Sequence, residues 1–272
     1  MESLHTGNDS QDDKENSLKG ISMAQQNIYD DDKFFESFKG LREGEINFND
    51  LIETPILLAM MPDLKDKHIL DVGCGMGQHA MQYIEIGASC VLGTDISEKM
   101  LGYARENNTA DNIRYVRLPF EELDKIDESF DVVTSSLAFD YAEDLCDVLK
   151  KINNLLIPGG KLVFSISNPI STAYDGVYDR YTRTEDGVRL YANLHNYNIE
   201  GLRKFKWVVD GYEVYHRRFS TLVNNIVSAG FIIEECQESQ LSEEIIRKYP
   251  DRFDGLYHHP DFIFFRCSKK TN

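Results

Sequence analysis

The chain has 272 residues, of which 42% are hydrophobic and 28% charged, and this is ordinary for a globular protein with one sizeable domain. The net charge of −17 argues against a nucleic-acid surface, because phosphate binding depends on clustered Lys and Arg. No apolar run approaches the roughly 18 residues that span a bilayer, and the polar N-terminus lacks signal-peptide features, so a cytoplasmic protein without membrane segments is expected.

The N-terminal part of the chain changes character near Asp32. Residues 1–24 are polar and acidic, which predicts a disordered tail ahead of a single domain over 25–272. From Asp32 on, apolar side chains recur at helical spacing and predict a short amphipathic helix. These side chains are Phe34, Phe35, Phe38 and Leu41. A second helix is expected over 49–61, ended by Pro62.

A regular alternation of strands and helices follows. The expected strands are 68–72, 90–94, 113–117, 130–135 and 161–167. The expected helices are 77–86, 97–107 with Ser97 as its N-cap, and 145–156, which is stopped by Pro158, Gly159 and Gly160. Such alternation with short links predicts an α/β fold with a mostly parallel sheet and helices on both faces.

The alternation breaks after the fifth strand. Residues 168–210 are rich in Tyr, Asn, Asp and Arg and show no clean period, which is typical of an inserted lid; we take 168–215 as this lid and substrate segment. The pattern resumes with a helix capped at Ser220 or Thr221. The last two strands are expected at 231–236 and 262–267.

Cysteines, histidines and basic residues give weaker signals. The five cysteines are scattered without a C-x-x-C pair, and the seven histidines lack ligand spacing, so neither a disulfide framework nor a metal site is expected. A basic stretch over 203–218 is either a solvated face or a contact for an anionic substrate.

The most informative segment is HILDVGCGMGQHA at 68–80, an apolar strand that runs into a glycine-rich turn and a helix. Glycines let the backbone approach a ligand, and the helix N-terminus supplies unpaired N–H groups. Asp71 ends the strand, where a carboxylate is costly unless it is paired or lies at a ligand site. Dinucleotide-binding turns have a glycine where this chain has Gln78, so a ligand with ammonium and sulfonium groups is favoured over a pyrophosphate. The residues assigned to this turn are Asp71, Gly73, Cys74, Gly75 and Gly77.

A second acid, Asp95, ends the next strand. There it is suited to accept hydrogen bonds from both ribose hydroxyls of a nucleoside; the alternative is a helix-capping acid. Ile96 and Met100 follow at positions that either flank an adenine or fill the core.

Five segments in this order resemble the class I S-adenosylmethionine-dependent methyltransferases, over roughly 28–267. They are LDVGCGMG (70–77), GTDISEKML (93–101), IRYVRLPFEEL (113–123), SFDVVTSSLAFDY (129–141) and LLIPGGKLVFSISNP (155–169). The resemblance implies a Rossmann-like seven-stranded sheet with its last strand antiparallel, methyltransferase activity and S-adenosylmethionine as cofactor. It also implies that Phe120 and Glu121 lie beside the adenine and that Ser135, Ser136 and Leu137 line the methyl-donor end.

A narrower resemblance is to bacterial-type small-molecule methyltransferases, through SSLAFDY at 135–141 and YHRR at 215–218. Two positions depart from that pattern, because Asp140 and Asn168 stand where its members usually have histidine. The resemblance implies a small-molecule acceptor without identifying it.

Three residues are candidates to move a proton if the acceptor must lose one: Asp140, Tyr141 and His216. Asp140 is alternatively a helix N-cap, Tyr141 a core residue and His216 a structural histidine. Arg42 is a candidate partner for the methionine carboxylate. Tyr29, Phe34 and Phe35 either close over the sulfonium or only attach the N-terminal helix to the domain.

The sequence also bears on three other functions. Asp71, Gln78 and the missing Y-x-x-x-K motif argue against an NAD-dependent reductase. An RNA- or protein-directed methyltransferase is supported by the basic stretch alone, and a non-catalytic S-adenosylmethionine-binding domain stays open, as does the oligomeric state.

Overall fold

The computed structural model describes residues 27–44, 46–174, 176, 178–206, 210–249 and 253–271. The tail predicted over 1–24 lies outside these ranges. The described chain begins with the 3₁₀ turn η1 (Ile28–Asp30) and helix α2 (Asp32–Arg42), which the Asp31 carboxylate caps by accepting a hydrogen bond from the Phe34 amide. A π-helical turn η2 (Asn49–Glu53) continues into α3 (Thr54–Ala59), so both predicted N-terminal helices are present.

Seven strands form one sheet, in the order β10-β11-β5-β4-β1-β2-β3. Their bounds are His68–Val72 (β1), Cys90–Asp95 (β2), Ile113–Arg117 (β3), Phe130–Ser136 (β4), Leu156–Ser167 (β5), Phe231–Glu238 (β10) and Phe262–Lys269 (β11). The first five are mutually parallel, and β11 runs antiparallel between β5 and β10. The predicted Rossmann-like sheet with an antiparallel last strand is confirmed.

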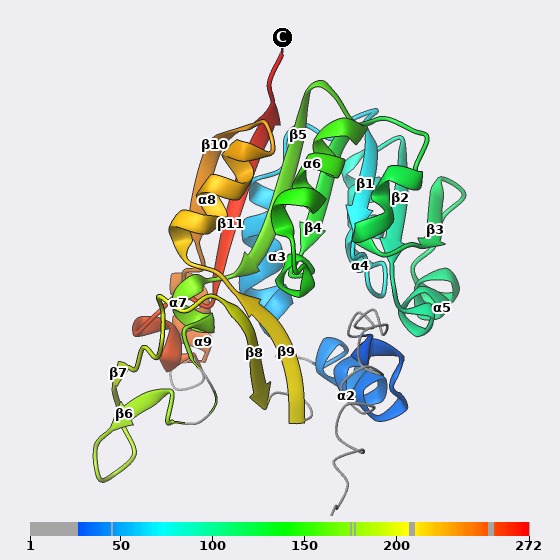
Figure 1. The fold of residues 1–272 in the computed structure, drawn as a ribbon. Coiled ribbons are helices and arrows are strands. Elements are labelled where there is room, and N and C mark those ends of the chain that lie inside the picture. The colour runs from blue at the N-terminus through cyan, green and yellow to red at the C-terminus, as the bar shows by residue number, and fades with distance from the viewer. Residues whose placement is uncertain are drawn as a thin grey trace, which may run out of the picture.

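Helices cover both faces of this sheet (Figure 1). On one face, α6 (Leu145–Leu155) and α8 (Phe219–Ser228) pack on the main apolar core, to which β1, β4, β5 and β11 contribute. On the other face lie α3 and α4 (Gln78–Ile86), and α5 (Glu98–Asn107) packs on β2 and β3. No helix in the described part of the chain is long and apolar enough to cross a membrane.

Two predicted boundaries differ from the structure. Strand β5 begins at Leu156 rather than 161, directly after α6, because Leu156 already pairs with Phe130 of β4. The Pro-Gly-Gly segment, with Gly159 at φ +76°, forms an irregularity in the strand before pairing resumes at Lys161. Helix α8 has Arg218 at its N-cap position without a side-chain cap. Its first amides are instead satisfied from the segment before it: the Arg218 amide donates to Glu200 and the Phe219 amide to the Tyr197 hydroxyl. The predicted caps Ser220 and Thr221 are therefore wrong.

The segment between β5 and α8, which we call the inserted segment (168–215), contains more regular structure than its sequence indicates. It holds the short helix α7 (Pro169–Thr172) and two hairpins, β6 (Tyr181–Arg183) with β7 (Arg189–Ala192) and β8 (Gly201–Lys206) with β9 (Asp210–His216). Both hairpins extend beyond the lower edge of the sheet in Figure 1. Helix α9 (Glu243–Lys248) and the 3₁₀ turn η5 (Asp254–Tyr257) follow β10 and were likewise not predicted.

Candidate active site

One cavity of about 660 Å³ lies at the carboxyl ends of the parallel strands. The strand order reverses between β1 and β4, and the crevice at such a reversal is where open α/β sheets bind ligands. Its walls come from α2, the glycine turn after β1, the ends of β2 and β4, the inserted segment and the start of β11.

The three glycines of the turn all have positive φ, at +72° for Gly73, +53° for Gly75 and +80° for Gly77. A Cβ added to Gly73 would lie 2.3 Å from the Ala138 Cβ, and one added to Gly77 would lie 2.2 Å from the Tyr115 hydroxyl. A Cβ at Gly75 would meet nothing within 4 Å. Protein packing therefore excludes a Cβ at Gly73 and Gly77. A Cβ at Gly75 would instead enter open space at the cavity wall.

Asp95 ties the glycine turn to the start of α5. One carboxylate oxygen accepts from the Gly75 amide at 2.9 Å and the other from the Ser97 amide at 2.8 Å. The α5 N-cap is Ser97, as predicted, so Asp95 is not the helix cap. Burial raises the pKa of Asp95, although these amide bonds favour its ionised form.

Asp71 is buried beside the turn. Its Oδ2 accepts no hydrogen bond from any described residue. Burial, and then the charges of Asp95 and Glu53, raise its pKa to about 8. Such a carboxyl group is costly to ionise unless a positive charge is brought near it.

The predicted site residues divide into those that line the cavity and those that do not. The lining ones are Gly73, Cys74, Gly75, Asp95, Ile96, Met100, Phe120, Glu121, Ser136, Asp140 and Tyr141. The others are Asp71, Gly77, Ser135 and His216. Ser135 is fully buried and donates to the Val72 carbonyl, which ties β4 to β1.

His216 has a structural environment. Its Nδ1 lies 2.8 Å from the Thr172 hydroxyl and its Nε2 2.9 Å from the Tyr197 carbonyl, so both ring nitrogens are engaged inside the inserted segment. Burial lowers the pKa of the ring, which favours neutral imidazole. His216 is therefore not placed to accept a proton from a molecule in the cavity.

Asp140 lies in the 3₁₀ turn η4 (Phe139–Tyr141) after β4, almost fully buried but on the cavity wall. Its carboxylate accepts from the Ser167 hydroxyl at 2.8 Å and from the Ser167 amide, which joins the ends of β4 and β5. Burial raises its pKa to about 6, against these bonds and the charge of Arg217. The alternative of a helix N-cap is wrong, because Asp144 caps α6.

Three tyrosine hydroxyls form a chain across the cavity. Tyr29 lies 2.6 Å from Tyr141, and Tyr141 lies 2.8 Å from Tyr212, oxygen to oxygen. Tyr29 comes from η1 and Tyr212 from β9, so the chain joins the N-terminal and inserted segments over the end of β4. Burial raises the pKa of all three, which keeps them protonated as hydrogen-bonding groups.

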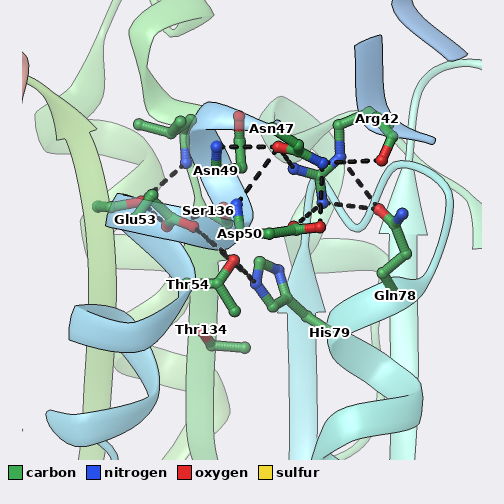
Figure 2. Close-up of polar contacts among 12 residues, drawn as sticks. Arg42, Asn47, Asn49, Asp50, Glu53, Thr54, Gln78, His79, Thr134 and Ser136 are labelled. Carbon is green, nitrogen blue, oxygen red and sulfur yellow. Dashed lines mark hydrogen bonds and ion pairs between the residues drawn. The ribbon is translucent and has the colours of Figure 1, made fainter. Parts of the chain in front are cut away.

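A buried acid that the sequence analysis missed, Glu53, lies on η2. It has no exposed surface and accepts hydrogen bonds from Ser136 and Ser165 at the ends of β4 and β5 (Figure 2). Thr54 also donates to it, at 3.3 Å, and bonds His79 Nε2 at 3.2 Å. An isolated Glu before an apolar helix was the available signal, but only the fold reveals its partners.

Arg42, at the end of α2, anchors a separate polar network (Figure 2). Its guanidinium donates to the Gln78 side chain at 2.7 and 3.2 Å and to Asn47 at 3.2 Å, and lies 3.4 Å from Asp50. Gln78 begins α4, so a largely buried cation is fixed at the N-terminus of the helix that follows the glycine turn. Arg42, Asn47 and Gln78 all line the cavity.

The chain is similar in sequence to known proteins. A family model described as a methyltransferase domain matches residues 70–164. An uncharacterized protein of Haemophilus influenzae is 36% identical over 249 residues, covering 89% of this chain and 96% of that protein.

Two solved structures are similar along nearly their whole length. A putative S-adenosylmethionine dependent methyltransferase from Listeria monocytogenes is 31% identical with a TM-score of 0.73, covering 80% of this chain and 96% of its own. An S-adenosylmethionine dependent methyltransferase from Mesorhizobium loti is 32% identical with a TM-score of 0.73, covering 85% and 100%. The chain belongs to the class I S-adenosylmethionine-dependent methyltransferases, and S-adenosylmethionine is its cofactor.

Proposed function

We propose that this chain methylates a small molecule that enters the cavity beside the cofactor. The observation that carries the proposal is the continuity of that cavity. A single space of about 660 Å³ extends from the glycine turn and Asp95 to the tyrosine chain and the inserted segment. Cavities of roughly 300–1,000 Å³ are typical of sites for small ligands.

The residues present fit S-adenosylmethionine. Asp71 carries a buried carboxylate oxygen without a partner, and a Cβ at Gly75 would meet only open space. The Asp71 oxygen thus lacks a positively charged partner, and Gly75 leaves room for a ligand to approach the backbone closely. Because Asp71 does not line the cavity, we assign it an electrostatic effect on the cofactor's ammonium group rather than a contact.

Other lining residues are assigned by their chemistry. Asp95 keeps lone pairs for the ribose hydroxyls beside the amides that it already accepts from. Ile96, Met100 and Phe120 offer apolar surface to the adenine, next to Glu121. Arg42 offers a buried cation to the methionine carboxylate, held in place by Gln78.

The cofactor supplies an activated methyl group, so the protein has mainly to align the acceptor and exclude water. The tyrosine chain covers the acceptor end and offers neutral hydroxyls to orient a polar acceptor. Asp140, with its pKa raised to about 6 by burial, is ionised at neutral pH and is the group assigned to take up an acceptor proton.

Charge and access support a small molecule over RNA or protein. A net charge of −17 opposes binding to nucleic acid. The basic stretch falls largely on the β8–β9 hairpin, and Phe205, Tyr212 and Val214 of this hairpin line the cavity.

The test has two steps. S-adenosylhomocysteine at 100 times its Kd should stabilise the fold by about 2.7 kcal/mol, while NADH should not. The protein is then incubated with methyl-labelled S-adenosylmethionine and a cell extract separated into metabolites, RNA and protein. Label in a metabolite supports the proposal, whereas label confined to RNA or protein contradicts it.

A further inference from the structure

The inserted segment brings one arginine to the cavity wall. Arg180 precedes β6 and is about one-third exposed. It is the only Lys or Arg among the described lining residues other than Arg42, which is fixed beside the glycine turn. Arg180 contacts Ser171 of α7, whereas Asp95 ends β2 just before α5. In Figure 1, β6 and α7 lie on the side of the molecule away from α5.

Arg180 is held in place through one nitrogen. Its Nη2 donates to the Ser171 hydroxyl and carbonyl and lies 3.2 Å from Asp261 Oδ1. Nη2 carries two of the five N–H donors of a guanidinium, so three remain on Nη1 and Nε. Within the described part of the chain these three have no acceptor.

Asp261 holds this arginine in place but pairs with only one of its nitrogens, Nη2. The same oxygen that meets Arg180 also accepts from Ser171 and lies 3.5 Å from His259 Nδ1. His259 is bonded in turn to the Tyr181 hydroxyl. Arg180 therefore has a fixed side chain with spare donors, which suits recognition of a planar anion with little loss of side-chain entropy.

Aromatic side chains line the same cavity as Arg180. Tyr174 and Phe205 stack with centroids 5.9 Å apart and planes within 9°, and both line the cavity. Phe48 contacts Phe253 at 5.4 Å and Phe262 at 5.8 Å, and these three also line it. Aromatic walls favour a flat apolar molecule over a flexible polar one.

Building on the proposed function, we infer that the methyl acceptor is a flat, apolar carboxylic acid whose carboxylate pairs with Arg180. The carboxylate is bound at the end of the cavity remote from the methyl donor. Arg180 is thus a specificity-determining residue, and methylation takes place at another atom of the same molecule.

The test compares acids with their neutral amides. Phenylacetate, 4-hydroxybenzoate and indole-3-acetate, each paired with its amide, are titrated by calorimetry into protein saturated with S-adenosylhomocysteine. In at least one pair we expect the acid to bind about tenfold more tightly or better, the range for charge-assisted hydrogen bonds. Arg180→Met should reduce that preference to less than about threefold.

Arg183→Met is the matched control, since Arg183 lies nearby on β6, donates to the Gly187 carbonyl and does not line the cavity. It should keep the wild-type preference. The inference is overturned if acid and amide bind equally in all pairs, or if the preference survives Arg180→Met. S-adenosylhomocysteine binding that is retained in every variant shows that the fold is intact. If the wild type did not bind S-adenosylhomocysteine, the proposed function would be overturned instead of this inference.

Discussion

The hydroxyl oxygens of Tyr29 and Tyr141 lie 2.6 Å apart, although 112 positions separate them in the sequence. Their rings meet edge to face with centroids 5.9 Å apart. The neighbouring Asp30 accepts from the Ser97 hydroxyl and the Lys99 amide at the start of α5. Two adjacent residues of η1 thus attach the N-terminal segment to both the cofactor end and the acceptor end of the cavity.

Tyr29→Phe removes the hydroxyl and keeps the ring. We expect the free energy of unfolding to fall by about 0.5–1.5 kcal/mol, because a buried hydrogen bond is lost while the aromatic packing remains. Urea denaturation followed by circular dichroism measures this. Tyr103→Phe is the control, since Tyr103 bonds Glu43 at an exposed site, and it should change stability by less than about 0.5 kcal/mol. Equal losses of unfolding free energy in the two variants would show that the buried Tyr29–Tyr141 hydrogen bond stabilises the fold no more than the exposed one.

Asp95→Ala removes the proposed ribose acceptor and two bonds that order the glycine turn. We expect S-adenosylhomocysteine to bind at least about tenfold more weakly, since one charge-assisted hydrogen bond contributes about 1.5–3 kcal/mol. Calorimetric titration gives the Kd, and circular dichroism confirms the fold. Unchanged affinity in a folded variant would refute the ribose role.

Gly73→Ala and Gly75→Ala separate packing from ligand approach. Both place Ala at positive φ, which costs about 1–2 kcal/mol. Only Gly73→Ala also collides with protein, so it should be the less stable variant in a thermal melt. Gly75→Ala should stay closer to wild-type stability yet lose S-adenosylhomocysteine affinity, because its methyl group enters open space on the cavity wall. The reverse order of stability would contradict the geometry of the turn.

Asp71→Asn tests the buried carboxyl group. Burial raises the pKa of Asp71 from 3.8 to about 8. Between about pH 4 and 8, Asp71 is therefore protonated in the folded protein and ionised in the unfolded chain. The folded state therefore loses stability as pH rises through this window, and neutral Asn removes that loss. The unliganded variant should be more stable than wild type by at least about 1 kcal/mol at pH 8 and similar to it near pH 4.5.

Urea denaturation across this pH range gives the comparison, with the exposed Asp111→Asn as control. In wild type, S-adenosylhomocysteine affinity should also rise from pH 6 to 8, because the ligand's ammonium favours ionised Asp71. A stability difference that stays constant with pH would contradict the buried ionisation.

Much of the sheet could be predicted because its signals are local. Apolar strands, caps such as Ser97 and the glycine turn each use neighbouring residues. The boundaries of the sheet strands agree with the structure to within two positions, apart from the start of β5. The hairpins of the inserted segment could not be found this way. In β8, Arg203 and Lys204 stand side by side between Leu202 and Phe205, so this strand lacks the polar–apolar alternation that marks a half-buried strand. Strand β9 begins with Asp210 and Gly211, residues that are typical of turns.

A polar contact could be found from the sequence where one motif contains both partners, and it was missed where the partner is distant. Asp95 bonds Gly75 and Ser97, both within the recognised motifs. Glu53 depends on serines 83 and 112 positions away, which no spacing rule connects. For His216 the sequence leaves a base and a structural histidine as alternatives, and only the structure shows that both ring nitrogens are engaged.

Asp140→Asn and His216→Gln distinguish the two candidate bases once the labelled acceptor is identified. For Asp140→Asn we expect kcat to fall by about 10²–10⁴-fold if the acceptor loses a proton, with S-adenosylhomocysteine affinity retained. In wild type, kcat should fall as pH drops through about 6, because protonated Asp140 cannot accept a proton. His216→Gln should instead lower the free energy of unfolding by about 1–3 kcal/mol, through loss of buried hydrogen bonds, and leave kcat and its pH dependence near wild type. A large loss of kcat in folded His216→Gln, with Asp140→Asn fully active, would return the proton-accepting role to the histidine.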